Sequence, residues 1–294
     1  MKKATKKMVF LSGIGILMVS TLAISLNTDL HVVHYSVKSN KISRPVKIAL
    51  ITDLHSCDYG ENQSELIDEL FRQNPDLVLL GGDIVDDKLP QDKAKEFLSA
   101  VSQSFPCFYV TGNHELWSRN ADQIKMMIEG YGIPVLEGES VSFASNGEYI
   151  TICGVDDPDI GVEQFEQQLQ NCQKHLEPEQ FSILLAHRPE RIDRYCQGGF
   201  DLVLSGHAHG GQWRIPGVLN GLLAPNQGLF PQYAGGMYEL EKTHMIVSRG
   251  LARESTRVPR IFNRPELVVV ELAPESNMPS TAGKTMTQDG KIGV

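Results

Sequence analysis

Three apolar runs alternate with amphipathic segments in the first half of this chain, and this alternation constrains the fold more than any other feature. The runs are Val46–Thr52, Asp76–Leu80 and Cys107–Thr111. Each is apolar enough to form a strand that is buried on both faces. Apolar residues at helical spacing predict helices at 63–72, 91–102 and 121–129. Short strands that alternate with helices predict a parallel sheet with right-handed crossovers, and therefore an α/β fold.

The pattern changes after Gly132. Short strands separated by Gly and Asn turns are predicted at 133–136, 141–144 and 149–153, followed by a helix over 161–175. Further strands are predicted at 181–186, 202–205, 244–248 and 267–272. Residues 210–237 are rich in Gly, Pro, Asn and Gln, which predicts a long irregular loop of the kind that is usually functional or mobile.

The N-terminus differs from the rest of the chain. Lys2, Lys3, Lys6 and Lys7 precede an uncharged, mostly apolar stretch from Met8 to about Leu26. This length predicts an N-terminal transmembrane helix, with a cleaved signal segment as the alternative. Lysines before the stretch favour a single-pass cell-membrane protein whose catalytic domain is extracytoplasmic, and cleavage would instead give a secreted protein.

The expected organisation follows from these changes in composition. It is an anchor or signal segment over residues 1–28, a polar linker over 29–45, one domain over 46–273 and a disordered tail over 274–294. The five cysteines show no CxxC spacing, which argues against a zinc ribbon or a disulfide framework and leaves a single disulfide open. The net charge of −9 argues against nucleic-acid binding. It is compatible with a phosphate substrate, because bound divalent cations would invert the local charge.

Polar motifs stand directly after five of the predicted strands. They are Asp53-Leu54-His55, Gly81-Gly82-Asp83, Gly112-Asn113-His114-Glu115, the single His187, and Gly206-His207-Ala208-His209. Ligands of open α/β sheets bind beyond the carboxyl ends of the strands, so these side chains are expected at one edge. Carboxylate, imidazole and amide groups suit divalent ions such as manganese, iron or zinc. The two oxygens of Asp83 can bridge two such ions.

The order of these motifs resembles the calcineurin-like metallophosphoesterase superfamily over residues 46–272. The segments Gly206–Gln212 and Ser248–Gly250 are similar to those of its membrane-associated bacterial branch, which includes lipid-nucleotide pyrophosphatase-like phosphodiesterases. The resemblance implies a four-layer α-β-β-α sandwich that holds two divalent metal ions per chain.

The resemblance also implies a role for each motif residue. The first ion would be held by Asp53, His55, Asp83 and His209. The second would be held by Asp83, Asn113, His187 and His207, with Asp83 shared. His114 would be the catalytic residue and not a ligand, stabilising the transition state or protonating the leaving oxygen. A hydroxide that bridges the ions would attack phosphorus in line.

One departure from the superfamily narrows the substrate. Its phosphoprotein phosphatases carry an Asp-Arg-Gly after the Gly-Asp motif, whereas Asp83 is followed here by Ile84-Val85-Asp86-Asp87-Lys88. The missing arginine disfavours a protein phosphatase and favours a phosphodiester or another small phosphoester. Arg249 is a candidate substrate-binding residue, with an ordinary surface ion pair as the alternative.

The leading interpretation is a metal-dependent phosphoesterase that cleaves a phosphodiester or pyrophosphate bond in a lipid-linked or nucleotide substrate. The alternatives are a phosphomonoesterase and a non-catalytic metal-dependent binding module. Four aromatic residues of the Gly-rich loop region predict either an apolar substrate wall near the membrane or a small satellite core. They are Trp213, Phe230, Tyr233 and Tyr238.

Overall fold

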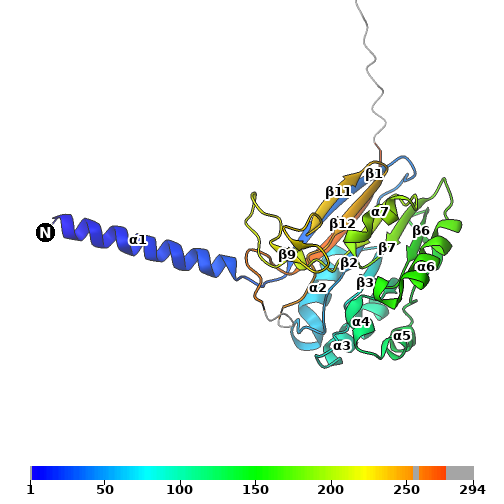
Figure 1. Cartoon of the computed structure of the whole chain (residues 1–294), viewed down its shortest axis with the longest axis horizontal. Coiled ribbons are helices and arrows are strands. Elements are labelled where there is room, and N and C mark those ends of the chain that lie inside the picture. The colour runs from blue at the N-terminus through cyan, green and yellow to red at the C-terminus, as the bar shows by residue number, and fades with distance from the viewer. Residues whose placement is uncertain (1, 254–257, 276–294) are drawn as a thin grey trace, which may run out of the picture.

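The computed structural model describes residues 2–253 and 258–275, so the predicted disordered tail lies almost wholly outside the described residues. Two sheets form the centre of the molecule (Figure 1). The first has the strand order β1-β13-β2-β3-β4. Its strands are β1 His31–Ser39, β13 Glu266–Pro274, β2 Val46–Ile51, β3 Leu77–Gly81 and β4 Cys107–Val110.

The second sheet has the order β11-β12-β8-β7-β6-β5. Its strands are β11 Gly236–Leu240, β12 Thr243–Val247, β8 Leu202–Ser205, β7 Phe181–Leu185, β6 Glu148–Gly154 and β5 Ser140–Ser145. A separate two-stranded ribbon pairs β9 Leu223–Ala224 with β10 Gly228–Leu229. The helices are α1 Lys2–Ser25, α2 Ser64–Gln73, α3 Asp92–Ser104, α4 Asn113–Trp117, α5 Ala121–Gly130, α6 Val162–Lys174 and α7 Ile192–Cys196.

Three apolar clusters show how these elements are layered. The first sheet packs on α2, α3 and α5 through one cluster. The two sheets pack face to face through a second, to which Leu50 and Leu79 contribute from one sheet and Ile183 and Leu204 from the other. The third lies between the second sheet and α6 and α7. The resulting order is helices, sheet, sheet, helices.

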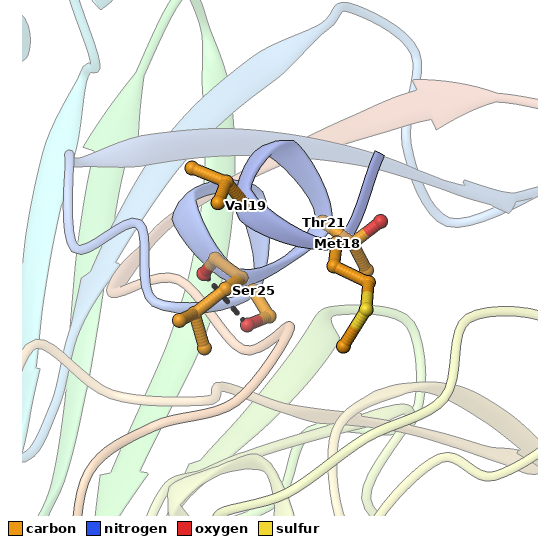
Figure 2. A pocket seen from close by; sticks show the side chains of 5 residues that line it. Met18, Val19, Thr21 and Ser25 are labelled. Carbon is orange, nitrogen blue, oxygen red and sulfur yellow. Dashed lines mark hydrogen bonds between the residues drawn. The ribbon is translucent and has the colours of Figure 1, made fainter. Parts of the chain in front are cut away.

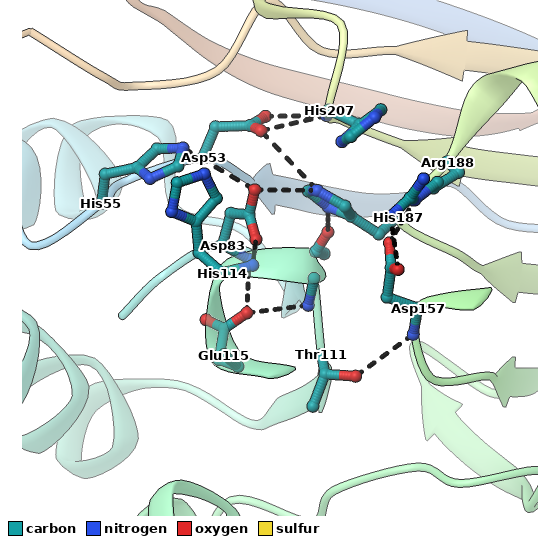
Figure 3. A network of polar contacts seen from close by, with 12 residues as sticks. Asp53, His55, Asp83, Thr111, His114, Glu115, Asp157, His187, Arg188 and His207 are labelled. Carbon is teal, nitrogen blue, oxygen red and sulfur yellow. Dashed lines mark hydrogen bonds and ion pairs between the residues drawn. The ribbon is translucent and has the colours of Figure 1, made fainter. Parts of the chain in front are cut away.

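Parallel pairing brings the functional ends of the strands together. Strands β2, β3 and β4 pair in parallel, and so do β6, β7, β8 and β12. The carboxyl ends of β2, β3 and β4 meet those of β7 and β8 across the sandwich, because contacts after all five strands converge there (Figure 3). The α/β prediction for the first half is confirmed, and the three predicted helices are present with bounds shifted by one or two residues.

Residues 29–45, expected to form a polar linker, instead contain β1, which pairs in parallel with β13 along nine residues. The reason is a period-two pattern along the strand. Val33, Tyr35 and Val37 are buried or half-buried, whereas His34 and Ser36 are exposed. The strand expected at 133–136 is reduced to an isolated bridge between Tyr109 and Val135.

The expected irregular loop at 210–237 contains the β9–β10 ribbon and the start of β11. The N-terminal stretch forms α1, which projects from the domain (Figure 1). Within the part of the chain that the structure describes, no helix has the length and apolar character needed to cross a bilayer, so the transmembrane helix of the expected fold is not found there.

Candidate metal centre

Sharp turns at the strand ends orient the side chains of the predicted metal ligands towards one another. Five of them have a left-handed backbone with φ between 48° and 65°, and they are Asp53, His55, Asp83, His207 and His209. This conformation is uncommon for residues other than glycine, and such strain concentrates at functional sites. The hydrogen bonds Asp53 N–H to Gly82 O and His55 N–H to Asp83 O join the first two turns. The strained backbone is therefore fixed by its neighbours.

The turns bring the predicted ligands into two groups that share one residue (Figure 3). The first group consists of Asp53, His55, Asp83 and His209, and the second of Asp83, His187 and His207. Within each group, one ligand atom per residue lies within 4.8 Å of the others. Asp83 thus stands between two candidate cation positions.

The distances around Asp83 show how close the groups are. Its Oδ2 lies 3.1 Å from His187 Nε2 and 3.7 Å from His55 Nε2. In the first group, Asp53 Oδ1 lies 3.6 Å from His209 Nε2. All these side chains are buried or nearly so.

Several buried polar atoms at this point form no hydrogen bond, although Asp83 Oδ2 and His187 Nε2 lie within ion-pair distance of each other. The atoms without a hydrogen bond are His55 Nε2, Asp83 Oδ2, Asn113 Oδ1, His187 Nε2 and His209 Nδ1. Such buried polar atoms are rare, and a group of them needs an explanation. Imidazole nitrogens and oxygens in this number fit divalent cations, so the residues present suit a two-metal site. Asn113, expected in the second group, is buried at the start of α4 with its side-chain oxygen free for that purpose.

Hydrogen bonds on the far side of the rings orient the histidines. His187 Nδ1 donates to the Gly81 carbonyl at 2.8 Å, and His55 Nδ1 lies 3.0 Å from Asp86 Oδ2. Both rings therefore turn Nε2 towards Asp83. His207 Nε2 contacts Asn226 Oδ1 at 2.8 Å, which leaves its Nδ1 for an ion. Such outer partners raise the basicity of metal-ligating histidines and fix their tautomer.

Charge balance in the centre depends on His187. Burial lowers the pKa of His187, but the carboxylates of Asp83 and Asp53 outweigh burial and raise it to about 10. Burial raises the pKa of Asp83, but the charge of His187 holds it well below its ordinary value. Burial and the neighbouring His187 lower the pKa of His207 to about 3. The two buried carboxylates thus require positive charge, which bound cations would supply.

His114 lies beside the two groups and belongs to neither of the shared-carboxylate sets. Its backbone N–H donates to Asp83 Oδ1 at 2.8 Å, and its ring Nδ1 lies 2.7 Å from Asp87 Oδ1. The ring packs edge-on to His55 and is a fifth exposed, more than the buried ligands. It is therefore placed to reach a substrate bound over the centre.

Glu115 holds the loop after β3 in place. Its buried carboxylate accepts hydrogen bonds from the backbone N–H groups of Asp83, Ile84, Val85 and Gly112, at 2.8 to 3.0 Å. The last residue of the Gly-Asn-His-Glu motif therefore supports the Asp83 turn from beneath (Figure 3). Its role is structural.

Three supporting residues were not identified in the sequence. Asp86, Asp87 and Asn226 touch the functional histidines, and the only signal was their position in loops that follow the motifs. Arg188, next to His187, is buried and pairs with Asp157 through two hydrogen bonds of 2.6 and 2.8 Å. Both stand at strand ends and brace the β7 loop from behind.

Arg249 forms an ion pair within the protein. Its guanidinium pairs with the Glu266 carboxylate at the start of β13. That ion pair was the alternative to a substrate-binding role, and the substrate-binding role stays a prediction.

The sequence of the chain is similar to those of known proteins. Residues 46–211 match the family model described as calcineurin-like phosphoesterase. The chain is 30% identical to YpbG of Bacillus subtilis (strain 168) over 237 residues, which cover 78% of this chain and 81% of YpbG. It is 28% identical to the phosphodiesterase YaeI of Escherichia coli (strain K12) over 236 residues, covering 78% and 82%. The solved structure of phosphopantetheinyl hydrolase (PptH) from Mycobacterium tuberculosis aligns with a TM-score of 0.48 and 14% identity, covering 76% of this chain and 96% of that one.

Proposed function

This chain belongs to the calcineurin-like phosphoesterase family, and we propose that it is a two-metal phosphodiesterase that cleaves a phosphodiester or pyrophosphate bond. The observation that carries the proposal is the shared carboxylate of Asp83, with buried ligand atoms that form no hydrogen bond on both sides of it. We assign Asp53, His55, Asp83 and His209 to one ion and Asp83, Asn113, His187 and His207 to the other. Two ions bound there supply Lewis acidity and an activated water for attack on phosphorus.

His114 supplies the remaining chemistry. Its ring is held by Asp87 at Nδ1, and its backbone is held by Asp83. The opposite ring nitrogen is therefore available to bind a phosphoryl oxygen or to give a proton to the leaving oxygen.

The charges beside His114 support a diester substrate. Asp87 stands where the related phosphoprotein phosphatases have arginine, and Asp86 precedes it. A phosphomonoester is a dianion near neutral pH and is repelled by a nearby carboxylate more strongly than a monoanionic diester is. The relative YaeI is named a phosphodiesterase, which agrees with this choice.

The test compares two chromogenic substrates. The purified protein is assayed with bis-p-nitrophenyl phosphate and with p-nitrophenyl phosphate, each with added manganese. We expect faster turnover of the diester, and no turnover after chelation. Preference for the monoester would replace the diester assignment with a phosphomonoesterase. Absence of turnover with both substrates, in protein shown to contain metal, would indicate a binding module.

A further inference from the structure

The loop region after His209 exposes large apolar side chains. We define the apolar patch as Trp213, Ile215, Val218, Leu223, Leu229, Phe230 and Val258. Val218 is 82% exposed, Phe230 67% and Leu229 66%. Single exposed apolar residues are normal on a protein surface, but a contiguous group marks an interaction site.

The residues of the patch are exposed and are not part of a satellite core beneath the loop. Tyr233 and Tyr238, two of the four aromatic residues singled out in the sequence, are partly buried and pack against the apolar cluster beneath the second sheet. Trp213 and Phe230, the other two, face outward. Tyr233 and Tyr238 therefore belong to a core, as one predicted alternative has it. Trp213 and Phe230 form an exposed apolar surface, as the other has it.

Backbone hydrogen bonds hold the patch in shape. Trp213 forms a bridge with Ile261, and its indole Nε1 donates to the Pro259 carbonyl at 3.0 Å. The β9–β10 ribbon and the bond from Phe230 N–H to Leu222 O fix the second half. A hollow of about 170 Å³ with an apolar lining lies between the halves and begins at Gly211, two residues beyond His209. The patch is therefore ordered and adjoins the metal centre along the chain.

The end of α1 joins the same surface. The backbone N–H of Phe262 donates to Ser25 O at 2.7 Å, and Phe262 follows Ile261, the partner of Trp213. Met18, Val19 and the side chains around them line a hollow along the exposed helix (Figure 2). In Figure 1 the end of α1, the β9 loop and the chain before β13 lie on the same side of the domain.

The described residues of the segments 202–238 and 248–265 are basic, although the whole chain is acidic. They contain five arginines and no acidic residue, whereas the chain has 36 acidic residues against 27 basic ones. One of the five, Arg260, is buried. Arg249 and Arg253 pair with Glu266 and Glu65. Arg214 and Arg264 donate instead to neutral oxygens of Asn220, Asp29 and Leu30, so they keep their charge for an anionic surface.

We propose that the apolar patch docks on a lipid bilayer with anionic headgroups and brings the metal centre to phosphodiesters at that surface. The most exposed residues of the patch lie at a turn and at the end of the ribbon: Val218 is in a turn, Leu229 ends β10 and Phe230 follows it. Such tips enter a fluid bilayer interface, with arginines at the headgroups. A second protein would require a complementary, closely packed surface. The statement about the substrate rests on the proposed function, whereas the docking surface does not.

The two tryptophans of the chain allow a direct test. In the full-length Trp117→Phe variant, Trp213 is the only tryptophan. The probe is a vesicle of phosphatidylcholine with about a third phosphatidylglycerol and brominated acyl chains, which quench tryptophans that reach the hydrocarbon. We expect quenching of Trp213 by about half or more relative to unbrominated vesicles, and a blue shift. The Trp213→Phe variant, which keeps only Trp117, is the control and is expected to be quenched less than Trp213, because Trp117 lies beside the His114 ring and outside the apolar patch.

The design separates the patch from α1, which is itself apolar. Quenching of Trp213 requires the patch to contact the bilayer, whatever else attaches the protein to the vesicles. Unquenched Trp213 in protein that sediments with vesicles would overturn the proposal. So would a failure to sediment, or a dimer in solution that buries Trp213.

Matched substitutions test the tips. The double variant Leu229→Ser with Phe230→Ser is expected to weaken vesicle affinity about tenfold or more, because two apolar side chains no longer leave water. Val162→Ser, at an equally exposed position on α6, is expected to change it less than about twofold. Equal affinities for all three proteins would contradict the proposal. Hydrolysis of bis-p-nitrophenyl phosphate by the unaltered protein is measured separately, so loss of the proposed function and loss of docking give different results.

Discussion

Asp83 is the residue on which the centre depends. One of its oxygens faces His187 and His55, and the other accepts the backbone N–H of His114. It therefore connects the two candidate cation positions to His114, the histidine that we propose to be catalytic. Removing it and removing His114 should have separable consequences.

We predict that Asp83→Ala loses metal together with activity, whereas His114→Ala keeps metal and loses about 10²- to 10⁴-fold in turnover, the usual contribution of general acid–base catalysis. Elemental analysis of both purified variants, combined with the diesterase assay, checks this. Two ions per chain in Asp83→Ala would show that the bridging assignment is wrong.

Asp87 gives a prediction about substrate choice. Asp87→Asn removes a negative charge beside His114 but keeps a hydrogen-bond acceptor for the ring. We expect the monoester-to-diester ratio of kcat/KM to rise about three- to tenfold, because the doubly charged monoester is repelled less. A ratio that is unchanged or lower would show that Asp87 does not set this preference.

At the residue scale, much of the centre could be predicted because its residues are fixed by topology. Asp53, Asp83 and His187 follow buried strands directly, and the carboxyl ends of parallel strands must meet. Asp86, Asp87 and Asn226 could not be assigned in the same way. Each contacts its histidine from a loop, and the direction of a loop side chain depends on tertiary packing that has no sequence period.

At the scale of elements, the turn after β3 packs closely against the start of α4. A Cβ on Gly112 would lie 2.2 Å from Asp83 Oδ1 and 2.5 Å from the Asp83 nitrogen. The carboxylate of Glu115, one turn later, accepts hydrogen bonds from backbone N–H groups of the loop that contains Asp83. The position of the shared carboxylate is therefore set jointly by two elements.

The matched pair Gly112→Ala and Gly130→Ala tests this fit. Gly112→Ala should lower the free energy of unfolding by about 1–3 kcal/mol and reduce metal content, because the new methyl group displaces Asp83. Gly130 ends α5 in open space, and Gly130→Ala should be neutral or stabilising by up to about 1 kcal/mol. Thermal denaturation and elemental analysis measure both effects. Equal results for the two variants would contradict the steric account.

The elements themselves were predictable where periodicity was strong. The helices α2, α3 and α5 and the strands β2, β3 and β4 follow from apolar spacing and short loops. Strand β1 was missed because its alternation covers only residues 33–37, and its pairing with β13 extends the strand along nine residues. The five-residue helix α4 is also too short to leave a periodic signal. Both are stabilised by tertiary contacts more than by their own sequence.

At the scale of the whole molecule, the centre lies where two sheets meet, so its buried carboxylates are fixed by the sandwich. A cation that binds there stabilises the folded chain, because the unfolded chain offers no such site. We predict that chelation lowers the melting temperature and abolishes activity, and that returning manganese restores both. At an ion concentration 100-fold above Kd, the stabilisation is about 2.7 kcal/mol. A melting temperature insensitive to chelation and to added metal would argue against a buried metal site.

The placement of the molecule in the cell stays a prediction. The lysine-led N-terminal stretch predicts an extracytoplasmic domain, and the apolar patch supports our proposal of a bilayer-facing surface beside the metal centre. Fluorescence of Trp213 on vesicles tests whether the apolar patch faces a bilayer, whichever side of the membrane the domain occupies.

The most direct test of the two-metal account is a titration of metal-stripped protein with manganese, in which diesterase activity is followed against ions added per chain. The account predicts that activity remains low after the first equivalent and reaches its plateau at two, with Asp83→Ala inactive throughout. Full activity at one equivalent, or activity that is independent of added metal, would contradict it.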